Sequence, residues 1–201
     1  VIPTIAPFLL PRALPVIRTR FPDLKLYLRE DLTPRLVTAL KAGGLDAALI
    51  ALPYDMTGLE WAHVEDDELL AATPRGHPLA SGTTVALDSL SSDDLILLED
   101  GHCLRDHALA ACGVALPARA PGEEGGFAAT SLPTLVQMVG SGLGVSFLPA
   151  MAVESGLADQ ADISVRPLGA HHPSREIVVA WRKGSSRAAE GRLLAEALRK
   201  V

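Results

Sequence analysis

The chain has 201 residues, of which 48% are hydrophobic and 21% are charged. This composition is typical of a folded globular protein with one large or two small domains, and it excludes a disordered or coiled-coil chain. The formal net charge of −6 argues against duplex nucleic acid as a partner of this chain by itself, because phosphate binding needs a cationic surface. No apolar run approaches the roughly 20 residues that a membrane-spanning helix requires.

The first quarter of the sequence predicts strands alternating with helices. Residues 24–30 alternate between apolar and polar side chains, which indicates a half-buried strand. Thr33 and Pro34 are typical of a helix N-cap and first turn, and the apolar run 46–52 predicts a fully buried strand of a parallel sheet. We therefore expect strand 24–30, helix 34–42 and strand 46–52 to form one βαβ unit, with a strand at 1–5 and a helix at 8–20 upstream of it.

The alternation continues through the rest of the chain and predicts two α/β lobes. The chain is expected to leave the first lobe near residue 72 and to return within 165–175. The acidic run 65–68 lacks the spacing of a calcium loop and predicts a solvated turn, as does the pair His171 and His172. The remaining elements are strands at 59–65, 69–73, 94–99, 127–128, 144–148, 163–168 and 175–181, helices at 103–112 and 131–139, a Pro/Gly-rich loop at 113–126, and a closing helix with Leu193, Leu194, Ala197 and Leu198 on its apolar face.

The two cysteines lie at opposite ends of the helix predicted for 103–112. Cys103 is expected at the N-terminus, where the helix dipole and the nearby side chains of His102, Arg105 and His107 favour the thiolate. Residues alone leave three alternatives open for Cys103: a small buried side chain, one ligand of a metal site with His107, or a peroxide-reactive thiol resolved by Cys112.

The spacing of the two cysteines has a geometric consequence. Nine helical residues advance by about 13.5 Å, whereas a disulfide tolerates Cα atoms no more than roughly 7 Å apart. Cys103 and Cys112 therefore cannot join while the helix is intact, and their oxidation would be a conformational switch.

The string Leu-Glu-Asp-Gly-His-Cys-Leu-Arg-Asp at 98–106, with Cys112 after it, resembles the regulatory domain of the OxyR family of peroxide-sensing LysR-type transcription regulators. The resemblance extends over the whole chain, with further matching strings at 4–11, 129–132 and 142–150. One departure is the segment between Cys112 and Ala129, which is longer and richer in Pro and Gly than in the family.

The resemblance implies a two-lobed fold like that of type 2 periplasmic binding proteins, with mixed sheets flanked by helices. Subdomain I would span about 1–72 and 170–201 and subdomain II about 73–169, and an N-terminal winged helix-turn-helix domain would be absent from this chain. Cys103 would be the peroxidatic and Cys112 the resolving cysteine. The other implied site residues are Thr4, Thr33, His102 and Asp106 in the peroxide pocket and Arg175 near the thiolate, to which the local sequence adds Arg105 as a further thiolate-stabilising residue.

The resulting expectation is a hydrogen-peroxide-sensing, cytoplasmic transcription activator domain without metal or cofactor. Its expected partners are a second copy in a dimer, a tetramer in the full-length protein, DNA through the absent domain, RNA polymerase, and a glutaredoxin-type reductant. Two other functions compete with it: an inducer-binding domain of another LysR-type regulator, and a thiol peroxidase. An enzyme would consume many peroxides per cysteine pair, whereas we expect a sensor that does not turn over.

Overall fold

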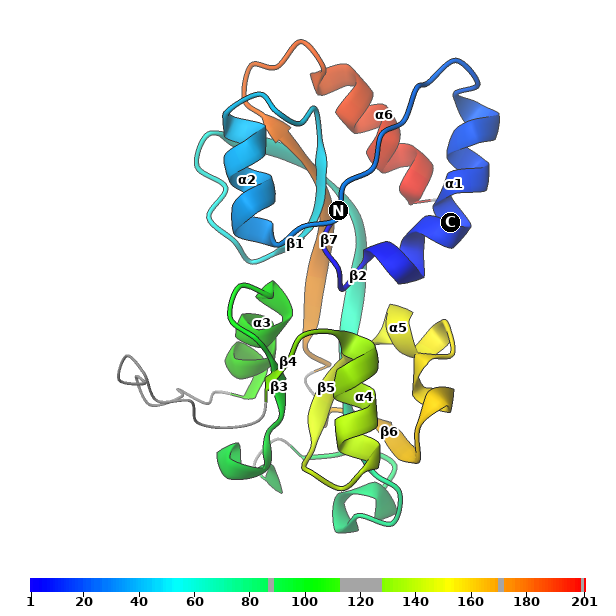
Figure 1. The fold of residues 1–201 in the computed structure, drawn as a ribbon, viewed down its shortest axis with the longest axis vertical. Helices are drawn as coiled ribbons and strands as arrows, with labels where there is room; N and C mark the ends of the chain where they lie inside the picture. The colour runs from blue at the N-terminus through cyan, green and yellow to red at the C-terminus, as the bar shows by residue number, and fades with distance from the viewer. Residues whose placement is uncertain (87–88, 113–127, 170–171, 200) are drawn as a thin grey trace. The chain divides into compact units, whose positions relative to one another are not determined.

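The computed structural model describes residues 1–86, 89–112, 128–169, 172–199 and 201, which divide into two compact units. Unit 1 consists of residues 1–67 and 175–201, and unit 2 of residues 68–174. The long strand β2 (Leu59–Pro74) carries the chain from unit 1 into unit 2, and β7 (Ser174–Arg182) carries it back (Figure 1).

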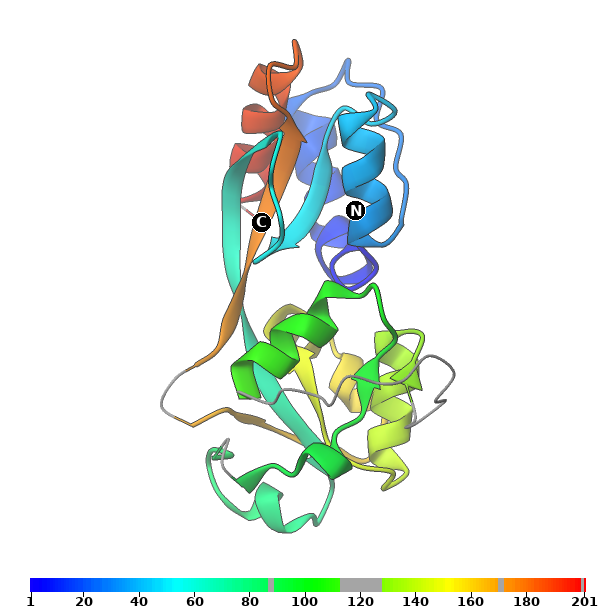
Figure 2. The same ribbon diagram turned by 90° about the vertical axis from the view of Figure 1, so that its left-hand side faces the viewer.

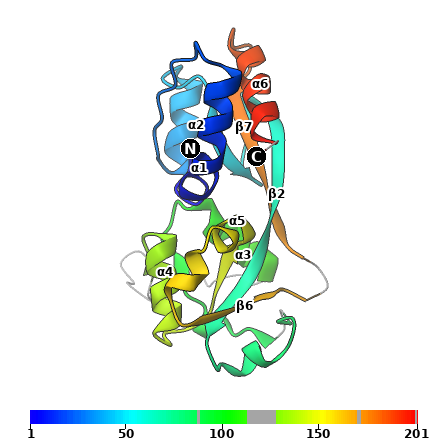
Figure 3. The same ribbon diagram turned by 90° about the vertical axis from the view of Figure 1, so that its right-hand side faces the viewer.

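Unit 1 is a sheet covered by three helices. Strand β1 (Ala48–Leu52) pairs with β7 in antiparallel register, Ile50 opposite Val178, and β7 in turn neighbours β2. Helix α2 (Thr33–Lys41) packs against β1, and α1 (Ala6–Arg20) lies beside α6 (Ala188–Leu198), as Figure 3 shows. Because helices cover the sheet, most side chains of β1 and β7 are buried.

A glycine allows helix α6 to approach β7 closely. A Cβ atom at Gly191 would lie only 2.5 Å from a ring carbon of Trp181, which is 1% exposed. The same indole donates its Nε1 hydrogen to Glu60 of β2 at 3.1 Å. The helix therefore rests directly on the largest side chain of the unit 1 core.

Unit 2 is built around the second half of β2, which pairs antiparallel with β5 (Ser146–Pro149) and β6 (Ile163–Pro167). A separate short parallel pair is formed by β3 (Leu97–Leu98) and β4 (Ala128–Ala129), and helix α3 (Cys103–Cys112) packs against β3 (Figure 2). Ser131 caps the next helix by accepting a hydrogen bond from the Thr134 amide. The bounds are β3 (Leu97–Leu98), α3 (Cys103–Cys112), β4 (Ala128–Ala129), α4 (Leu132–Gly140), β5 (Ser146–Pro149), α5 (Ala150–Glu154) and β6 (Ile163–Pro167), with 3₁₀ turns at Pro78–Ser81, Ser92–Asp94 and Leu157–Gln160.

The mixed α/β class predicted from the sequence is confirmed. The helices predicted at 8–20, 34–42, 103–112 and 131–139 correspond to α1, α2, α3 and α4. Helix α5 was not predicted, because its five residues follow β5 directly without a polar break. None of the helices in the described ranges is long and apolar enough to cross a membrane.

The predicted βαβ unit is wrong. Residues 24–30 form no strand and are exposed, and residues 1–5 form no strand either, with residues 3–5 in a turn leading into α1. Strand β1 pairs antiparallel with β7 rather than in a parallel βαβ ladder. The alternation in 24–30 predicts a half-buried strand, but no described strand pairs with this segment, and its residues are exposed.

Three smaller predictions also need correction. The strands predicted at 59–65 and 69–73 are one strand, β2, because the acidic run 65–68 lies within the strand and not in a turn. Thr33 is the first residue of α2 and makes no capping bond; the N-cap position belongs to Leu32. Leu193 is 43% exposed and lies outside the apolar face of α6. The predictions for 113–126, Phe127 and His171 lie outside the described residues.

Candidate functional site

The first group of predicted site residues lies where β3 ends and α3 begins. Gly101 makes the turn between the two elements with a φ of +94°, a left-handed conformation that favours glycine. Cys103, the first residue of α3, is 6% exposed, and His102 directly before it is 8% exposed. The thiol thus sits at the positive end of the helix dipole while shielded from solvent.

The side chains around Cys103 supply less positive charge than the sequence suggests. Desolvation by burial lowers the pKa of His102, against the opposing effects of Glu99 and a hydrogen bond with the Thr130 backbone. His102 is therefore mostly uncharged at neutral pH and adds little positive charge beside the thiol. Arg105 donates to the Leu98 carbonyl at 3.2 Å and pairs with Asp100 at 3.0 Å. Its guanidinium is anchored at the end of β3, with a carboxylate beside it.

The second cysteine ends the same helix. Helix α3 runs without a break from Cys103 to Cys112, so their Cα atoms are separated by roughly 13.5 Å. That separation is about twice what a disulfide allows. In agreement with this separation, Cys103 is a free cysteine in the structure. Asp106, also predicted for the site, lies exposed in the first turn of α3.

The second group of predicted residues lies in unit 1 around a buried arginine. Arg175 is 0% exposed; its Nε donates to Asp67 at 2.9 Å and a terminal nitrogen contacts the same carboxylate oxygen at 2.8 Å. Its terminal nitrogens also donate to the Thr4 hydroxyl at 2.8 Å and the Thr4 carbonyl at 2.9 Å. Arg175 is therefore not the solvated strand residue that its type would suggest without the resemblance.

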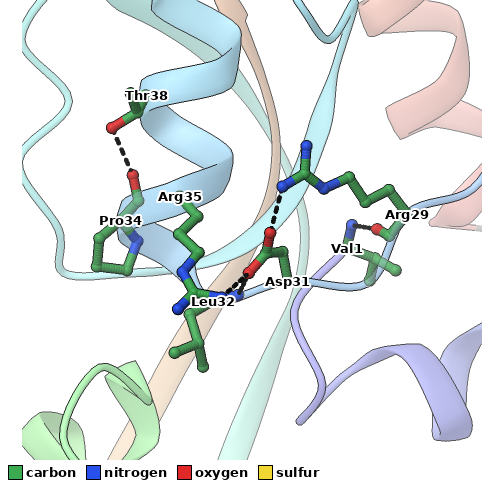
Figure 4. A network of polar contacts seen from close by, with 7 residues as sticks. All are labelled: Val1, Arg29, Asp31, Leu32, Pro34, Arg35 and Thr38. Atoms are coloured by element: carbon green, nitrogen blue, oxygen red, sulfur yellow. Dashed lines mark hydrogen bonds and ion pairs between the residues drawn. The ribbon is translucent and has the colours of Figure 1, made fainter.

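The two predicted threonines differ in their hydrogen bonding. The Thr4 hydroxyl accepts a hydrogen bond from Arg175, which leaves its own hydrogen available to donate. Thr33 is 1% exposed, and its hydroxyl oxygen has no hydrogen-bond partner within the described part of the chain. Thr38, one turn later, bonds instead to the Pro34 carbonyl at 2.8 Å, as Figure 4 shows. A buried hydroxyl without a partner costs stability, so Thr33 is a candidate for contact with a small polar ligand.

Sequence reasoning missed Asp67, which it placed in a solvated turn. The signal that could have found Asp67 is the two-residue period of a strand. Asp67, Leu69, Ala71 and Thr73 are alternate residues of β2 and all lie on its buried face.

Thr4 and Arg175 are brought together in unit 1, whereas His102, Cys103, Arg105 and Asp106 belong to unit 2. No group of three or more metal-ligating side chains gathers in the described portion of the chain.

Comparison with known proteins agrees with this geometry. The family model for the LysR substrate binding domain matches residues 1–201. The chain belongs to the LysR substrate-binding domain family. The predicted resemblance to OxyR regulatory domains is also confirmed: the reduced regulatory domain of OxyR2 from Vibrio vulnificus shares 41% identity, covers 99% of this chain and 92% of that chain, and has a TM-score of 0.85.

Curated members of this LysR family are longer proteins with regulatory names. A "Probable hydrogen peroxide-inducible genes activator" of Mycobacterium leprae is 40% identical over 200 residues, which are 97% of this chain and 61% of that protein. The "DNA-binding transcriptional dual regulator OxyR" of Escherichia coli K12 is 36% identical over 98% of this chain and 63% of its own length. The chain thus spans less than two thirds of these relatives, which are named as regulators and not as enzymes.

The Arg175 network gives a testable stability prediction. In Asp67→Asn the buried guanidinium loses its charged partner, which should lower the free energy of unfolding by about 3–5 kcal/mol. The matched control is Asp66→Asn, because Asp66 is the neighbouring residue but has a 68% exposed side chain whose one ion pair within the described ranges is with His63. That change should stay within about 0.5 kcal/mol of the unmodified chain. Chemical denaturation of both variants measures the difference; equal stabilities would contradict the assigned role of Asp67.

Proposed function

We propose that this chain is a hydrogen-peroxide-sensing regulatory domain that switches by forming a Cys103–Cys112 disulfide. The observation that carries the proposal is a buried cysteine at the N-terminus of α3 with a second cysteine at the end of the same helix. The names of the relatives, which describe peroxide-inducible gene activation and OxyR, support the same chemistry.

The reaction proceeds in two balanced steps. The Cys103 thiolate attacks one oxygen of hydrogen peroxide, the O–O bond breaks, and the leaving hydroxide takes a proton to become water while Cys103 becomes a sulfenic acid. The Cys112 thiol then attacks the Cys103 sulfur, the S–O bond breaks, and a second water leaves as the disulfide forms. Two thiols are oxidised by two electrons and one peroxide is reduced. A dithiol reductant of the glutaredoxin type would reverse the change by thiol–disulfide exchange.

In this proposal the hydroxyls of Thr4 and Thr33 orient the peroxide for attack. Each hydroxyl both donates and accepts, which matches a small molecule that does the same at both oxygens. The buried Thr33 oxygen without a described partner supports this role, as does the donor capacity that remains on Thr4. His102 and Asp106 are the other residues proposed to contact peroxide, and Arg105 and Arg175 are the proposed thiolate-stabilising cations.

The wider setting follows from the same proposal. Within a longer, cytoplasmic protein this domain would self-associate as a dimer and a tetramer. Its redox state would then govern how an attached winged helix-turn-helix domain meets DNA and RNA polymerase. The alternative, an inducer-binding domain for an organic anion, would need no reactive cysteine.

Intact mass and peptide mapping test the disulfide directly. One equivalent of peroxide should lower the mass of the reduced chain by two hydrogens and yield a 103–112 cross-linked peptide. With Cys112→Ser, oxidation should stop at the sulfenic acid of Cys103 or proceed to higher oxides. A chain that keeps both thiols after brief exposure to low peroxide would contradict the sensor and favour the inducer-binding alternative.

Comparing the substitutions Thr33→Val and Thr38→Val distinguishes a role of Thr33 in positioning peroxide from a role in stabilising the fold. Thr33→Val replaces a buried hydroxyl that has no described partner, so it should leave stability unchanged or raise it by about 1 kcal/mol. It should nevertheless slow peroxide oxidation of Cys103 by at least about tenfold, because orientation is lost. Thr38→Val, the matched control on the same helix, should leave the oxidation rate unchanged.

The reaction with iodoacetamide completes this test, since that reagent does not depend on the proposed threonine contacts. Its rate with Cys103 should be the same in Thr33→Val as in the unmodified chain. If both reagents slow equally, the substitution acts on the ionisation or burial of Cys103, and the positioning role of Thr33 is wrong.

A further inference from the structure

Asp67, within the acidic run 65–68, lies in the interior of unit 1 and has no role in the proposed sensor so far. It is 3% exposed, whereas the side chain of Asp66 beside it is 68% exposed. Asp67 lies on β2 and contacts Arg175 on the neighbouring strand β7. Both residues belong to unit 1, as does Thr4, so the three form one cluster within a single compact unit.

The arginine connects Asp67 to Thr4. The Nε and Nη2 atoms of Arg175 both contact Oδ2 of Asp67, at 2.9 and 2.8 Å. Nη2 also donates to the Thr4 carbonyl at 2.9 Å, and Nη1 donates to the Thr4 hydroxyl at 2.8 Å. Because the guanidinium is planar and rigid, holding Nε and Nη2 against the carboxylate also fixes the direction of Nη1. Asp67 thereby sets the hydrogen bond that the Thr4 hydroxyl receives.

That hydrogen bond determines what the Thr4 hydroxyl can do. A hydroxyl that accepts from a guanidinium keeps its own hydrogen for a different partner. Thr4 is 2% exposed, and its hydroxyl donates to no acceptor among the described residues. A buried donor without an acceptor costs stability and therefore points to a ligand that accepts from it.

Stability alone does not explain a charged side chain at position 67. Removing two charges from water is costly, and a buried ion pair can often be replaced by apolar side chains without loss of stability. An apolar pair, however, cannot hold a donor against the Thr4 hydroxyl. The carboxylate of Asp67 also offsets the positive charge of Arg175, so the ion pair has no net charge. The pair is therefore suited to orienting Thr4.

We propose that Asp67 is a positioning residue of the sensor, which makes the Thr4 hydroxyl a hydrogen-bond donor to peroxide. This inference rests on the proposed function, in which Thr4 contacts the peroxide. Asp67 acts through Arg175 and needs no contact with peroxide itself. Negative charge develops on the leaving oxygen as the O–O bond breaks, so a donor aimed at that oxygen stabilises the transition state more than the ground state. Without Asp67 the guanidinium is free to turn, and the Thr4 hydroxyl loses its fixed direction.

A double-mutant cycle between Asp67→Asn and Thr4→Val tests the proposal. The rates of Cys103 with peroxide and with iodoacetamide are measured in the Cys112→Ser background, where Cys103 is the one remaining thiol. Each single substitution should slow the peroxide reaction about tenfold, because the donor is misdirected or lost. Asp67→Asn should add no further slowing to Thr4→Val, because both substitutions act on the same hydroxyl.

The reaction with iodoacetamide distinguishes positioning of peroxide from loosening of the fold. Its maximal rate at high pH should be the same in every variant. The pH of its half-maximal rate should not rise in Asp67→Asn, since this substitution removes a negative charge. The matched control Asp66→Asn changes the exposed neighbour and should leave both reactions unchanged.

A second variant, Arg175→Lys, keeps the test informative if Asp67→Asn does not fold. Lysine retains a cation for the Asp67 carboxylate, but its single nitrogen cannot take the places of both Nε and Nη1. Arg175→Lys should therefore slow the peroxide reaction, and it should likewise add no slowing to Thr4→Val.

Two results would overturn the role of Asp67 while leaving the sensor itself in place. One is slowing by Asp67→Asn that persists undiminished in the Thr4→Val background, and the other is equal slowing with peroxide and iodoacetamide. A chain with native Asp67 and Thr4 whose Cys103 reacts with peroxide no faster than free cysteine would overturn both the sensor and the role of Asp67.

Discussion

The buried ion pair between Arg175 and Asp67 joins the parts of unit 1 that are far apart in the sequence. Asp67 lies on β2, Arg175 begins the returning part of unit 1 on β7, and the two remaining bonds of the guanidinium reach Thr4 just before α1. A fully desolvated guanidinium is tolerated only with nearly all of its donors satisfied, so these three positions constrain one another. The Thr4 hydroxyl is oriented as a consequence, and that orientation is what the proposed sensor uses.

The sequence is sufficient to predict structure where the interacting residues lie close together in the chain. Helix α3 begins at Cys103 and ends at Cys112 as predicted, because the Gly101 turn, the helix N-terminus and the spacing all lie within a dozen residues. The buried state of Asp67 and Arg175 could not be predicted in the same way. Their mutual neutralisation depends on a contact across 108 positions, and either residue alone is typical of a solvated surface.

The largest error, the strand predicted at 24–30, has a different cause. The alternation of Leu24, Leu26 and Leu28 is a property of the segment, but a strand also needs a partner with free backbone groups. Among the described residues, only Val1 forms such bonds with this segment, at one end of it. The sequence pattern therefore predicted neither the secondary structure nor the burial of 24–30, because both depend on a neighbouring strand.

A Cys103–Cys112 disulfide and an intact helix α3 exclude each other. Ten helical residues with small Ala108 among the buried contacts have little intrinsic stability, so a disulfide can unwind them at modest cost. Hydrogen exchange of the reduced chain and of a chain with a verified 103–112 disulfide tests this directly. We expect faster exchange in the disulfide form, concentrated within residues 103–112, with exchange of the β7 amides unchanged. Equal protection of 103–112 in both forms would contradict it.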